Sequence, residues 1–386
     1  MTQLRAHPGA AELIDLAYYS TESGQSFAEH ADAYAHFVAE GQNAGLNPSA
    51  YLYTDWYRWQ NPDSAQYSSV LDHFFEKAAT RQIDPAPFID SVGLLRALPD
   101  VGTALDLYRM LLGKRLCKIS PDIADHFARL DAARAAFHQR LDLRVLRDRG
   151  KQRPNLVWVQ SGHAFKFAQW FDAGAPRDWD LLCNWYALPC LDLRFGDIVL
   201  RQSGTKMTGI HNVLTHMPDL LLRYDRVLFL DDDLIFKHRD IDLLFGLVQE
   251  HNLDLFQPSV AAGSNCVWPS LFQRPNSTVR LTTGVEIMMF GFSNRALKLC
   301  APLFAKTVSG FGLDYACSAA VRAQGWRCGV LDAVPAQHLD KIDQSGGSYY
   351  QFMRSIGINQ KLELYETLAC SGGRPKFTPL ACEDGA

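Results

Sequence analysis

Three consecutive aspartates, Asp231, Asp232 and Asp233, directly follow a short apolar run, Val227 to Leu230. The run has the character of a buried strand, and open α/β sheets bind their ligands at the carboxyl ends of strands. Three adjacent negative charges repel one another, so a positive charge must offset them. Because hard divalent cations select carboxylate oxygens, the triplet favours a metal-dependent active site. A surface loop that tolerates the charges without a metal is the alternative.

The spacing of the triplet suggests how a metal would be held. In an extended segment alternate side chains share one face, so Asp231 and Asp233 can point together while Asp232 points away. Two such carboxylates with open coordination positions suit Mg²⁺ or Mn²⁺ bound jointly by the protein and a diphosphate. His338 follows a late apolar strand on a predicted loop and is a candidate metal ligand beside the triplet. A lone histidine, however, is more often structural.

A second group of residues reads Ser309-Gly310-Phe311-Gly312-Leu313-Asp314-Tyr315. The glycines on both sides of Phe311 let the backbone turn tightly and approach a ligand. Asp314 then begins a predicted helix that runs to Gln324. A carboxylate at that position is either an N-terminal cap or a catalytic base. The sequence favours the cap, and the two roles can coexist.

Weaker candidates are scattered along the chain. Glu286 lies inside the apolar run Val285 to Phe290, which predicts a buried strand, and a buried carboxylate is costly unless it is paired or functional. Acceptor-side catalysis and a structural ion pair are equally compatible with it. Lys206, after Gly204, either contacts a phosphate or nucleobase or is simply solvated. Gln160-Ser161-Gly162, at the end of the first predicted strand, contacts a nucleotide or forms a turn.

Strand-like apolar runs alternate with helical segments from Asn155 onwards. The runs are Leu156 to Val159, Asp178 to Cys183, Ile198 to Leu200, Val227 to Leu230 and Leu255 to Pro258. This alternation predicts an α/β domain with a mainly parallel sheet and helices on both faces. We expect that domain over residues 154–345.

Residues 1–115 contain a faint repeat of about 37 residues. His36 and His73 are 37 residues apart, and Asn47-Pro48 is echoed at the same distance by Asp84-Pro85. Such a period predicts stacked helical units, and therefore an all-α repeat domain before the α/β domain. We expect a linking helix over residues 116–153 and a tail over residues 346–386.

Composition excludes several classes of protein. A formal net charge of −4 gives no electrostatic reason to expect a nucleic acid or an anionic membrane as the main partner. No transmembrane run and no secretory signal pattern are visible. Nine cysteines form no Cys-x-x-Cys pair, which favours reduced thiols over a zinc site. We expect a cytoplasmic protein that could associate peripherally with the inner face of a membrane.

Taken in order, these segments resemble a GT-A glycosyltransferase, and most closely a glycosyltransferase-like family with five motifs. Here the motifs read Gly204-Thr205-Lys206, Tyr224-Asp225 to Asp233, Val285-Glu286, Gly310-Phe311-Gly312-Leu313-Asp314 and His338. Their order and approximate spacing match over about residues 155–340. Phe311 stands where that family has tryptophan, which keeps an aromatic face but loses an N–H donor. The helical repeats resemble, more loosely, modules attached to bacterial glycosyltransferases.

The resemblance implies a Rossmann-like GT-A fold, a nucleotide-sugar donor and a bound Mn²⁺ or Mg²⁺. The ion would be held by Asp231, Asp233 and His338 and would act as a Lewis acid on the departing diphosphate. The donor would contact Gln160, Ser161, Gly162, Lys206, Asp231, Asp232 and Gly312. If the reaction inverts the anomeric centre, Asp314 would take the proton of the acceptor hydroxyl, with Glu286 as the alternative base.

The same resemblance implies a saccharide or glycoconjugate acceptor, in bacterial surface polysaccharide or glycan synthesis. The helical repeats would grip a long acceptor or mediate homo-oligomer assembly. Two rival interpretations fit fewer residues. A haloacid-dehalogenase-type phosphatase also places Asp-x-Asp after a strand, but usually follows it with Thr or Val, whereas Leu234 follows here. A non-catalytic glycan- or protein-binding protein would not need the intact aspartate triplet.

Overall fold

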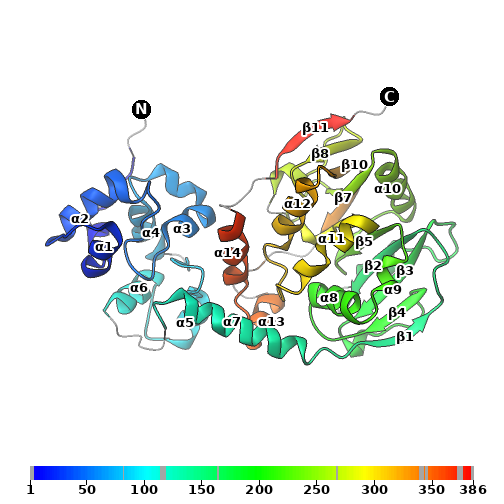
Figure 1. Ribbon diagram of the computed structural model, residues 1–386, viewed down its shortest axis with the longest axis horizontal. Helices are drawn as coiled ribbons and strands as arrows, with labels where there is room; N and C mark the ends of the chain where they lie inside the picture. Colours follow the sequence, from blue (N-terminus) through cyan, green and yellow to red (C-terminus); the bar gives the residue numbers. More distant parts are fainter. Residues whose placement is uncertain are drawn as a thin grey trace. The chain divides into compact units, whose positions relative to one another are not determined.

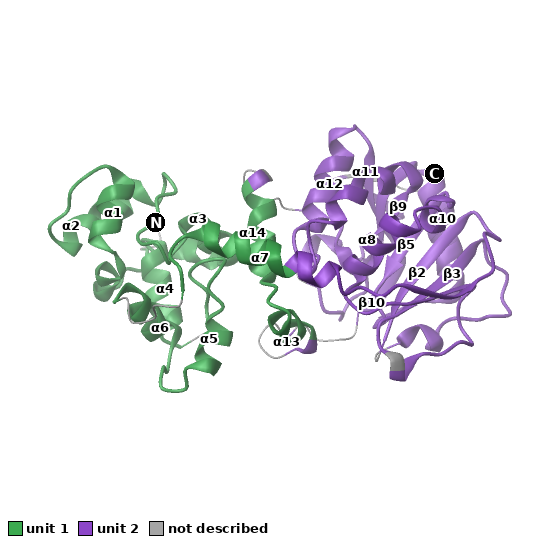
Figure 2. Ribbon diagram, turned by 60° about the horizontal axis from the view of Figure 1, so that its bottom comes forward, with its two compact units in different colours: residues 1–133, 349–369 green, residues 134–348, 370–386 purple. Residues whose placement is uncertain are grey.

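The computed structural model describes residues 4–80, 82–113, 119–162, 165–266, 268–338, 343, 347–371 and 377–383. The chain separates into two compact units, which Figure 2 distinguishes by colour. Unit 1 comprises residues 1–133 and 349–369, and unit 2 comprises residues 134–348 and 370–386. Within the described ranges, no helix combines the length and the apolar character needed to cross a lipid bilayer.

Unit 1 is built from short helices joined by turns (Figure 1). They are α1 (Leu16–Ser23), α2 (His30–His36), α3 (Thr54–Gln60), α4 (Val70–Ala78), α5 (Ser91–Ala97) and α6 (Ala104–Leu112), followed by most of α7 (Ile123–His138) and, from the C-terminal part of the chain, α13 (Ser348–Ser355) and α14 (Gln360–Ser371). Helices α1, α3 and α5 begin 38 and 37 residues apart. The repeat of about 37 residues as a structural unit stays a prediction.

Polar caps and an aromatic core stabilise these helices. The side chains of Asp15, Ser69, Asp90 and Thr103 each accept a hydrogen bond from the backbone N–H three residues ahead, which satisfies a donor that the first turn leaves unpaired. The buried core combines aliphatic side chains with five aromatic ones, Tyr19, Phe37, Tyr57, Phe74 and Tyr108.

Unit 2 contains one sheet in the strand order β1-β4-β3-β2-β5-β9-β7-β10-β8-β11 (Figure 1). The strands are β1 (Arg144–Asp148), β2 (Asn155–Ser161), β3 (Trp179–Trp185), β4 (Ile198–Arg201), β5 (Arg226–Leu230), β7 (Leu253–Val260), β8 (Val279–Thr282), β9 (Gly291–Ser293), β10 (Arg327–His338) and β11 (Pro379–Glu383), with β6 (Leu234–Ile235) paired to β10. The predicted α/β class is confirmed.

Six strands of the sheet pair in parallel with a neighbour and share one direction. Strands β2, β3, β4 and β5 pair in parallel, and so do β7 and β10. Between these groups β9 runs antiparallel to both β5 and β7, so the carboxyl ends of all six strands lie at one edge. Because β1, β8 and β11 also pair antiparallel, the sheet is mixed, and the expectation of a mainly parallel sheet is correct only for these six strands.

Helices cover both faces of the sheet. Helices α8 (Lys206–His216), α9 (Asp219–Leu222), α11 (Asn294–Phe304) and α12 (Leu313–Ala323) share one apolar cluster with strand residues such as Phe229 and Leu255. Helix α10 (His238–Glu250) packs on the other face, where Phe245 contacts Phe256, the neighbour of Leu255. Successive strand side chains point to opposite faces, so both layers are needed to bury the strands.

Two predicted segments have a different structure. The helix expected over residues 116–153 is α7, which spans only Ile123–His138; residues 116–118 lie outside the described ranges. Arg144–Asp148 form the edge strand β1 because they pair with β4. The tail expected over residues 346–386 contains α13 and α14, and also β11, which pairs with β8.

The apolar run Val285 to Phe290 is not a strand. Ile287–Met289 form a short 3₁₀ helix, and β9 begins only at Gly291. The backbone carbonyls of Ile287 and Met288 instead accept hydrogen bonds from the Lys206 ammonium, at 2.6 and 3.0 Å. The Met288 carbonyl also accepts from the backbone N–H of Asp231 at 3.1 Å, so a long-range side chain and a backbone donor share this segment in place of a regular strand pairing.

A buried ion pair joins β8 to β10. Arg280 Nε and a terminal guanidinium nitrogen donate to the two carboxylate oxygens of Asp332, at 2.5 and 3.0 Å. Both side chains are at most 1% exposed. Two further guanidinium N–H groups donate to the carbonyl oxygens of Ser270 and Phe272, so four of the five N–H donors of the buried charge are hydrogen-bonded.

We expect Asp332→Ala to lower the free energy of unfolding by about 3–5 kcal/mol, because Arg280 would remain buried without its counter-charge. Urea unfolding followed by tryptophan fluorescence measures the loss. Glu250→Ala, at an exposed position of α10, is the control and should change the free energy by less than about 0.5 kcal/mol. Equal free energies of unfolding for the two variants would show that the buried Arg280–Asp332 pair does not stabilise the fold.

Candidate active site

The aspartate triplet and His338 meet at the carboxyl edge of the sheet. Asp231 directly follows β5, and the short strand β6 pairs antiparallel with the end of β10, so that His338 lies opposite Leu234. This register places Asp233 beside the histidine, with His338 Nε2 2.9 Å from Asp233 Oδ2. His338 is the last residue of β10 and not a loop residue, because it pairs with β6.

The imidazole of His338 is fixed by a backbone carbonyl. Its Nδ1 lies 2.6 Å from the carbonyl oxygen of Asn265, which can only accept, so Nδ1 is the donor and Nε2 faces Asp233. Burial disfavours the charged ring, but the hydrogen bond and charge of Asp233 outweigh burial and raise the pKa of His338 to about 9. A carbonyl that holds the second ring nitrogen is also the usual support of a metal-ligating histidine.

Asp233 has an unsatisfied oxygen. Its side chain is 10% exposed, and Oδ1 is buried without a hydrogen-bond partner among the described residues. A buried carboxylate oxygen without a partner is costly, and a cation beside it would remove that cost. Asp233 and His338 therefore have the chemistry of two metal ligands.

The predicted third metal ligand, Asp231, is paired differently. Its Oδ1 lies 2.7 Å from the ammonium nitrogen of Lys206. Among the described residues, no three Asp, Glu, His or Cys side chains converge closely enough to hold a metal ion by themselves. Mg²⁺ is usually bound by one or two carboxylates together with substrate phosphates, so a pair of protein ligands fits an ion that a diphosphate completes.

Lys206 is buried and has no donor left for a ligand. Its side chain is 6% exposed, and its ammonium group contacts Asp231 Oδ1 and the carbonyl oxygens of Ile287 and Met288. An ammonium has three N–H donors, and these three contacts use them. The structure therefore directs Lys206 toward the protein interior, in contrast to the predicted contact with a donor phosphate or nucleobase.

Asp232 points to a different neighbour from Asp231 and Asp233. Its Oδ2 accepts a hydrogen bond from the Tyr186 hydroxyl at 3.1 Å. Burial, followed by the charges of Asp231 and Asp233, raises the pKa of Asp232 to about 6. Gly162 lies against the Tyr186 ring, where an added Cβ would fall 1.9 Å from a ring atom, so this position needs glycine for packing.

The other two residues predicted at the end of β2 are part of the sheet interior. Gln160 is 6% exposed, and its Oε1 accepts a hydrogen bond from Asn184 at 2.8 Å. Ser161 is fully buried, and its hydroxyl donates to the carbonyl oxygen of Val159. Their side chains shape the strand ends and do not project from the edge.

Glu286 carries a second unsatisfied oxygen. Its backbone N–H donates to Gln257 Oε1 at 2.6 Å, while its Oε2 is buried without a partner among the described residues. Burial, followed by the charge of Asp314, raises the pKa of Glu286 to about 7. A carboxyl group with this pKa changes its proton occupancy near neutral pH, as a general base or acid requires.

Asp314 is not the helix cap that the sequence favours. Gly312, with φ of 87°, is the N-cap of α12, and Asp314 lies inside the first turn, where its Oδ1 accepts from the backbone N–H of Tyr315 at 2.9 Å. Gly310 has φ of 90°, and an added Cβ would fall 2.8 Å from Ile287 and 2.9 Å from Met207. The backbone turn therefore requires glycine at both positions.

The site also uses residues that the sequence did not single out. Asn265 orients His338, Gln257 holds the backbone of Glu286, and Tyr186 binds Asp232. Asn265 acts through its backbone carbonyl, which carries no side-chain signal. Gln257 lies within β7 and Tyr186 directly follows β3, so their contacts with the site can be inferred only once the order of the strands is known.

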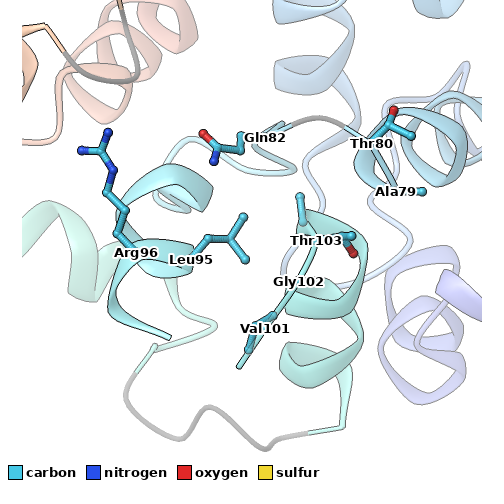
Figure 3. Close-up of a pocket in the computed structure, with 9 residues that line it drawn as sticks. Ala79, Thr80, Gln82, Leu95, Arg96, Val101, Gly102 and Thr103 are labelled. Carbon is cyan, nitrogen blue, oxygen red and sulfur yellow. The ribbon is translucent and has the colours of Figure 1, made fainter. Parts of the chain in front are cut away.

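A separate pocket in unit 1 contains none of the predicted site residues (Figure 3). Its volume is about 350 Å³, and it is lined by Ala79, Thr80, Gln82, Leu95, Arg96, Val101, Gly102, Thr103 and Ala104. Arg96 is the single charged residue in this lining as described. The pocket therefore offers no acid–base pair, and the carboxylate cluster of unit 2 is the candidate active site.

No protein-family model and no curated protein matches the sequence. Among solved structures, the chain is similar to A197 from STIV, with a TM-score of 0.29 and 14% sequence identity, covering 49% of this chain and 86% of that one. It is also similar to S. aureus TarS residues 1–349, with a TM-score of 0.33 and 14% identity, covering 56% and 71%. Scores this low do not assign a fold family, so the function must be inferred from the site.

Glu286 should make stability depend on pH. The folded state holds its proton up to about pH 7, whereas the unfolded state releases it near pH 4.5, so stability falls as pH rises through this window. Glutamine carries no charge, so Glu286→Gln avoids this loss. We expect the free energy of unfolding of Glu286→Gln, minus that of the unchanged protein, to be about 1–3 kcal/mol larger at pH 8 than at pH 4.5. Urea unfolding at the two pH values measures this difference, and an identical difference at both would contradict it.

Proposed function

We propose that this protein is a metal-dependent glycosyltransferase that moves a sugar from a nucleotide-sugar donor to a saccharide or glycoconjugate acceptor. One observation carries the proposal: Asp233 holds a buried, unpartnered oxygen beside a histidine whose second nitrogen is fixed by a carbonyl. The pair lies at the carboxyl edge of the sheet, next to further carboxylates. That arrangement suits the metal-bound diphosphate of an activated sugar.

Asp233 and His338 would hold the ion, Mn²⁺ or Mg²⁺, with the donor diphosphate completing its coordination. When bound, the ion neutralises negative charge on the departing nucleoside diphosphate. Asp233 would then gain the partner that its Oδ1 lacks, and His338 would present Nε2 as a neutral ligand. Nδ1 stays bonded to the Asn265 carbonyl throughout, so the ring does not need to reorient.

Glu286 is the better supported candidate for the base that accepts the proton of the acceptor hydroxyl. Its Oε2 has no partner among the described residues, and burial brings its pKa to about 7. Asp314, the base implied by the family resemblance, already accepts a backbone hydrogen bond within α12. In an inverting reaction Glu286 would receive the proton while the acceptor oxygen bonds to the anomeric carbon.

The nucleoside of the donor would lie at the ends of β2 and β3. Asp232 and Tyr186 form a hydrogen-bonded pair there, and Gly162 supports the tyrosine ring. Gln160 and Ser161 would act by shaping the strand end, since their side chains are buried. Unit 1 would bind a long acceptor or mediate self-assembly, and we place the reaction in the cytoplasm, in bacterial surface glycan synthesis.

The metal assignment is tested by donor binding. Calorimetry against a panel of nucleotide sugars, with and without Mn²⁺, should show binding that excess EDTA abolishes. Asp233→Asn should weaken metal-dependent binding at least about tenfold, because it removes a ligand charge. Asp219→Asn, at an exposed position of α9, should bind like the unchanged protein. Donor affinity that survives EDTA undiminished would rule out the metal.

The base assignment is tested by turnover. With a donor and acceptor identified, Glu286→Gln should lower kcat by about 10²–10⁴-fold while leaving donor affinity nearly unchanged, because general-base catalysis contributes about that factor. Asp314→Asn should cost less than Glu286→Gln. The reverse order of the two losses would return the role to Asp314, and unchanged turnover in both variants would exclude both of these carboxylates as the base.

A further inference from the structure

We propose that Lys206 is a built-in cation that withholds Asp231 from the metal, so that one divalent ion is bound by Asp233 and His338 without Asp231. The inference rests on the proposed function, because it assigns the ligands of the same ion. It differs from the motif-based expectation, in which Asp231 and Asp233 hold the metal together and Lys206 contacts the donor. Lys206 becomes a positioning residue that sets how many carboxylates the ion can use.

The contacts of Lys206 leave it no freedom to serve a ligand. The ammonium lies 2.7 Å from Asp231 Oδ1, 2.6 Å from the carbonyl oxygen of Ile287 and 3.0 Å from that of Met288. It also lies 5.5 Å from the centre of the Phe290 ring. Moving Lys206 toward a phosphate would break its contacts with Asp231 Oδ1 and the Ile287 carbonyl and would leave the Met288 carbonyl with only the backbone N–H of Asp231 as donor, and unmade buried hydrogen bonds are expensive.

The residues on both sides of Lys206 hold it in place. Thr205 is the N-cap of α8 and forms a reciprocal pair of hydrogen bonds with Thr208. The Thr205 hydroxyl also lies 2.6 Å from the carbonyl oxygen of Val308, just before the Gly310 turn. Met207 lies against Gly310, where an added Cβ would come within 2.9 Å of its side chain. The start of α8 is therefore anchored to the loop that leads to Asp314.

The charges of Lys206, Asp231 and Asp233 predict how tightly each variant binds the ion. Asp231 and Lys206 together are neutral, whereas Asp233 retains an oxygen that no described residue satisfies. An incoming divalent ion is repelled by the lysine ammonium and attracted by Asp233. Removing Lys206 alone should therefore strengthen metal binding, while removing both members of the neutral pair should leave it nearly unchanged. A lysine that only packs the core would leave Mn²⁺ affinity unchanged in the single variant, and an Asp231 that binds the metal would make the double variant lose binding.

The test is calorimetric titration of the full-length protein with MnCl₂ and no donor, with circular dichroism as a check on folding. We expect Lys206→Met to bind Mn²⁺ at least about tenfold more tightly than the unchanged protein, which corresponds to about 1.4 kcal/mol. The double variant Lys206→Met with Asp231→Asn should bind within about threefold of the unchanged protein. Asp233→Asn should lose binding, and the exposed control Lys298→Met should not differ.

Each result decides the inference. Equal Mn²⁺ affinity in Lys206→Met and the unchanged protein overturns it, as does a double variant that loses binding like Asp233→Asn. Binding by Lys206→Met alone supports it, because Asp231 then becomes available to the ion. Absence of binding in all variants overturns the inference, whereas the proposed function, in which a diphosphate completes the site, is decided separately by the donor titration with and without Mn²⁺. If Lys206→Met fails to fold, the double variant decides, because it removes the buried charge pair as a unit.

Discussion

Compensation of negative charge is the constraint on which the site depends. The strand ends and loops bring Asp231, Asp232, Asp233, Glu286 and Asp314 into one electrostatic cluster at one end of the sheet. Within the described part of the chain, Lys206 pairs with Asp231 and His338 pairs with Asp233. These two pairs do not satisfy the whole cluster: the pKa values of Asp232 and Glu286 are raised, and one carboxylate oxygen each of Asp233 and Glu286 has no hydrogen-bond partner among the described residues. These residual costs are what a metal ion and a proton would relieve.

The mixed direction of the sheet is what makes this cluster possible. Strand β9 runs antiparallel between β5 and β7, which brings the segment with Glu286 next to the end of β5. Met288 and Phe290 then accept hydrogen bonds from the backbone of Asp231 and Phe229. Strand β6 pairs antiparallel with β10 and so sets Asp233 beside His338. A purely parallel sheet would lack both short strands and would separate these acids.

In the fold, the Gly204-Thr205-Lys206 segment at the start of α8 has a different role from the one that its residue types suggest. Its residue types suit phosphate binding when read in isolation, because a glycine and a lysine precede a helix. In the fold the lysine turns inward, and the threonine binds the loop before Gly310. The segment thus joins the aspartate triplet, the Glu286 segment and the Gly-Phe-Gly turn into one framework. Its contribution is to hold these neighbouring segments in place, since the Lys206 ammonium and the Thr205 hydroxyl are already hydrogen-bonded within the protein.

The sequence alone determined the α/β class, most strands of the sheet, and the position of the aspartate triplet after β5, because apolar runs and glycines act locally on the backbone. It did not determine that Val285 to Phe290 leaves the strand conformation, that Asp314 follows the cap, or which acid pairs with which base. Those outcomes depend on contacts between residues far apart, such as Lys206 with Met288, 82 residues away. Burial and charge pairing are properties of the assembled sheet, so only the tertiary structure could decide that Asp231 meets a lysine while Asp233 is left with a buried oxygen to satisfy.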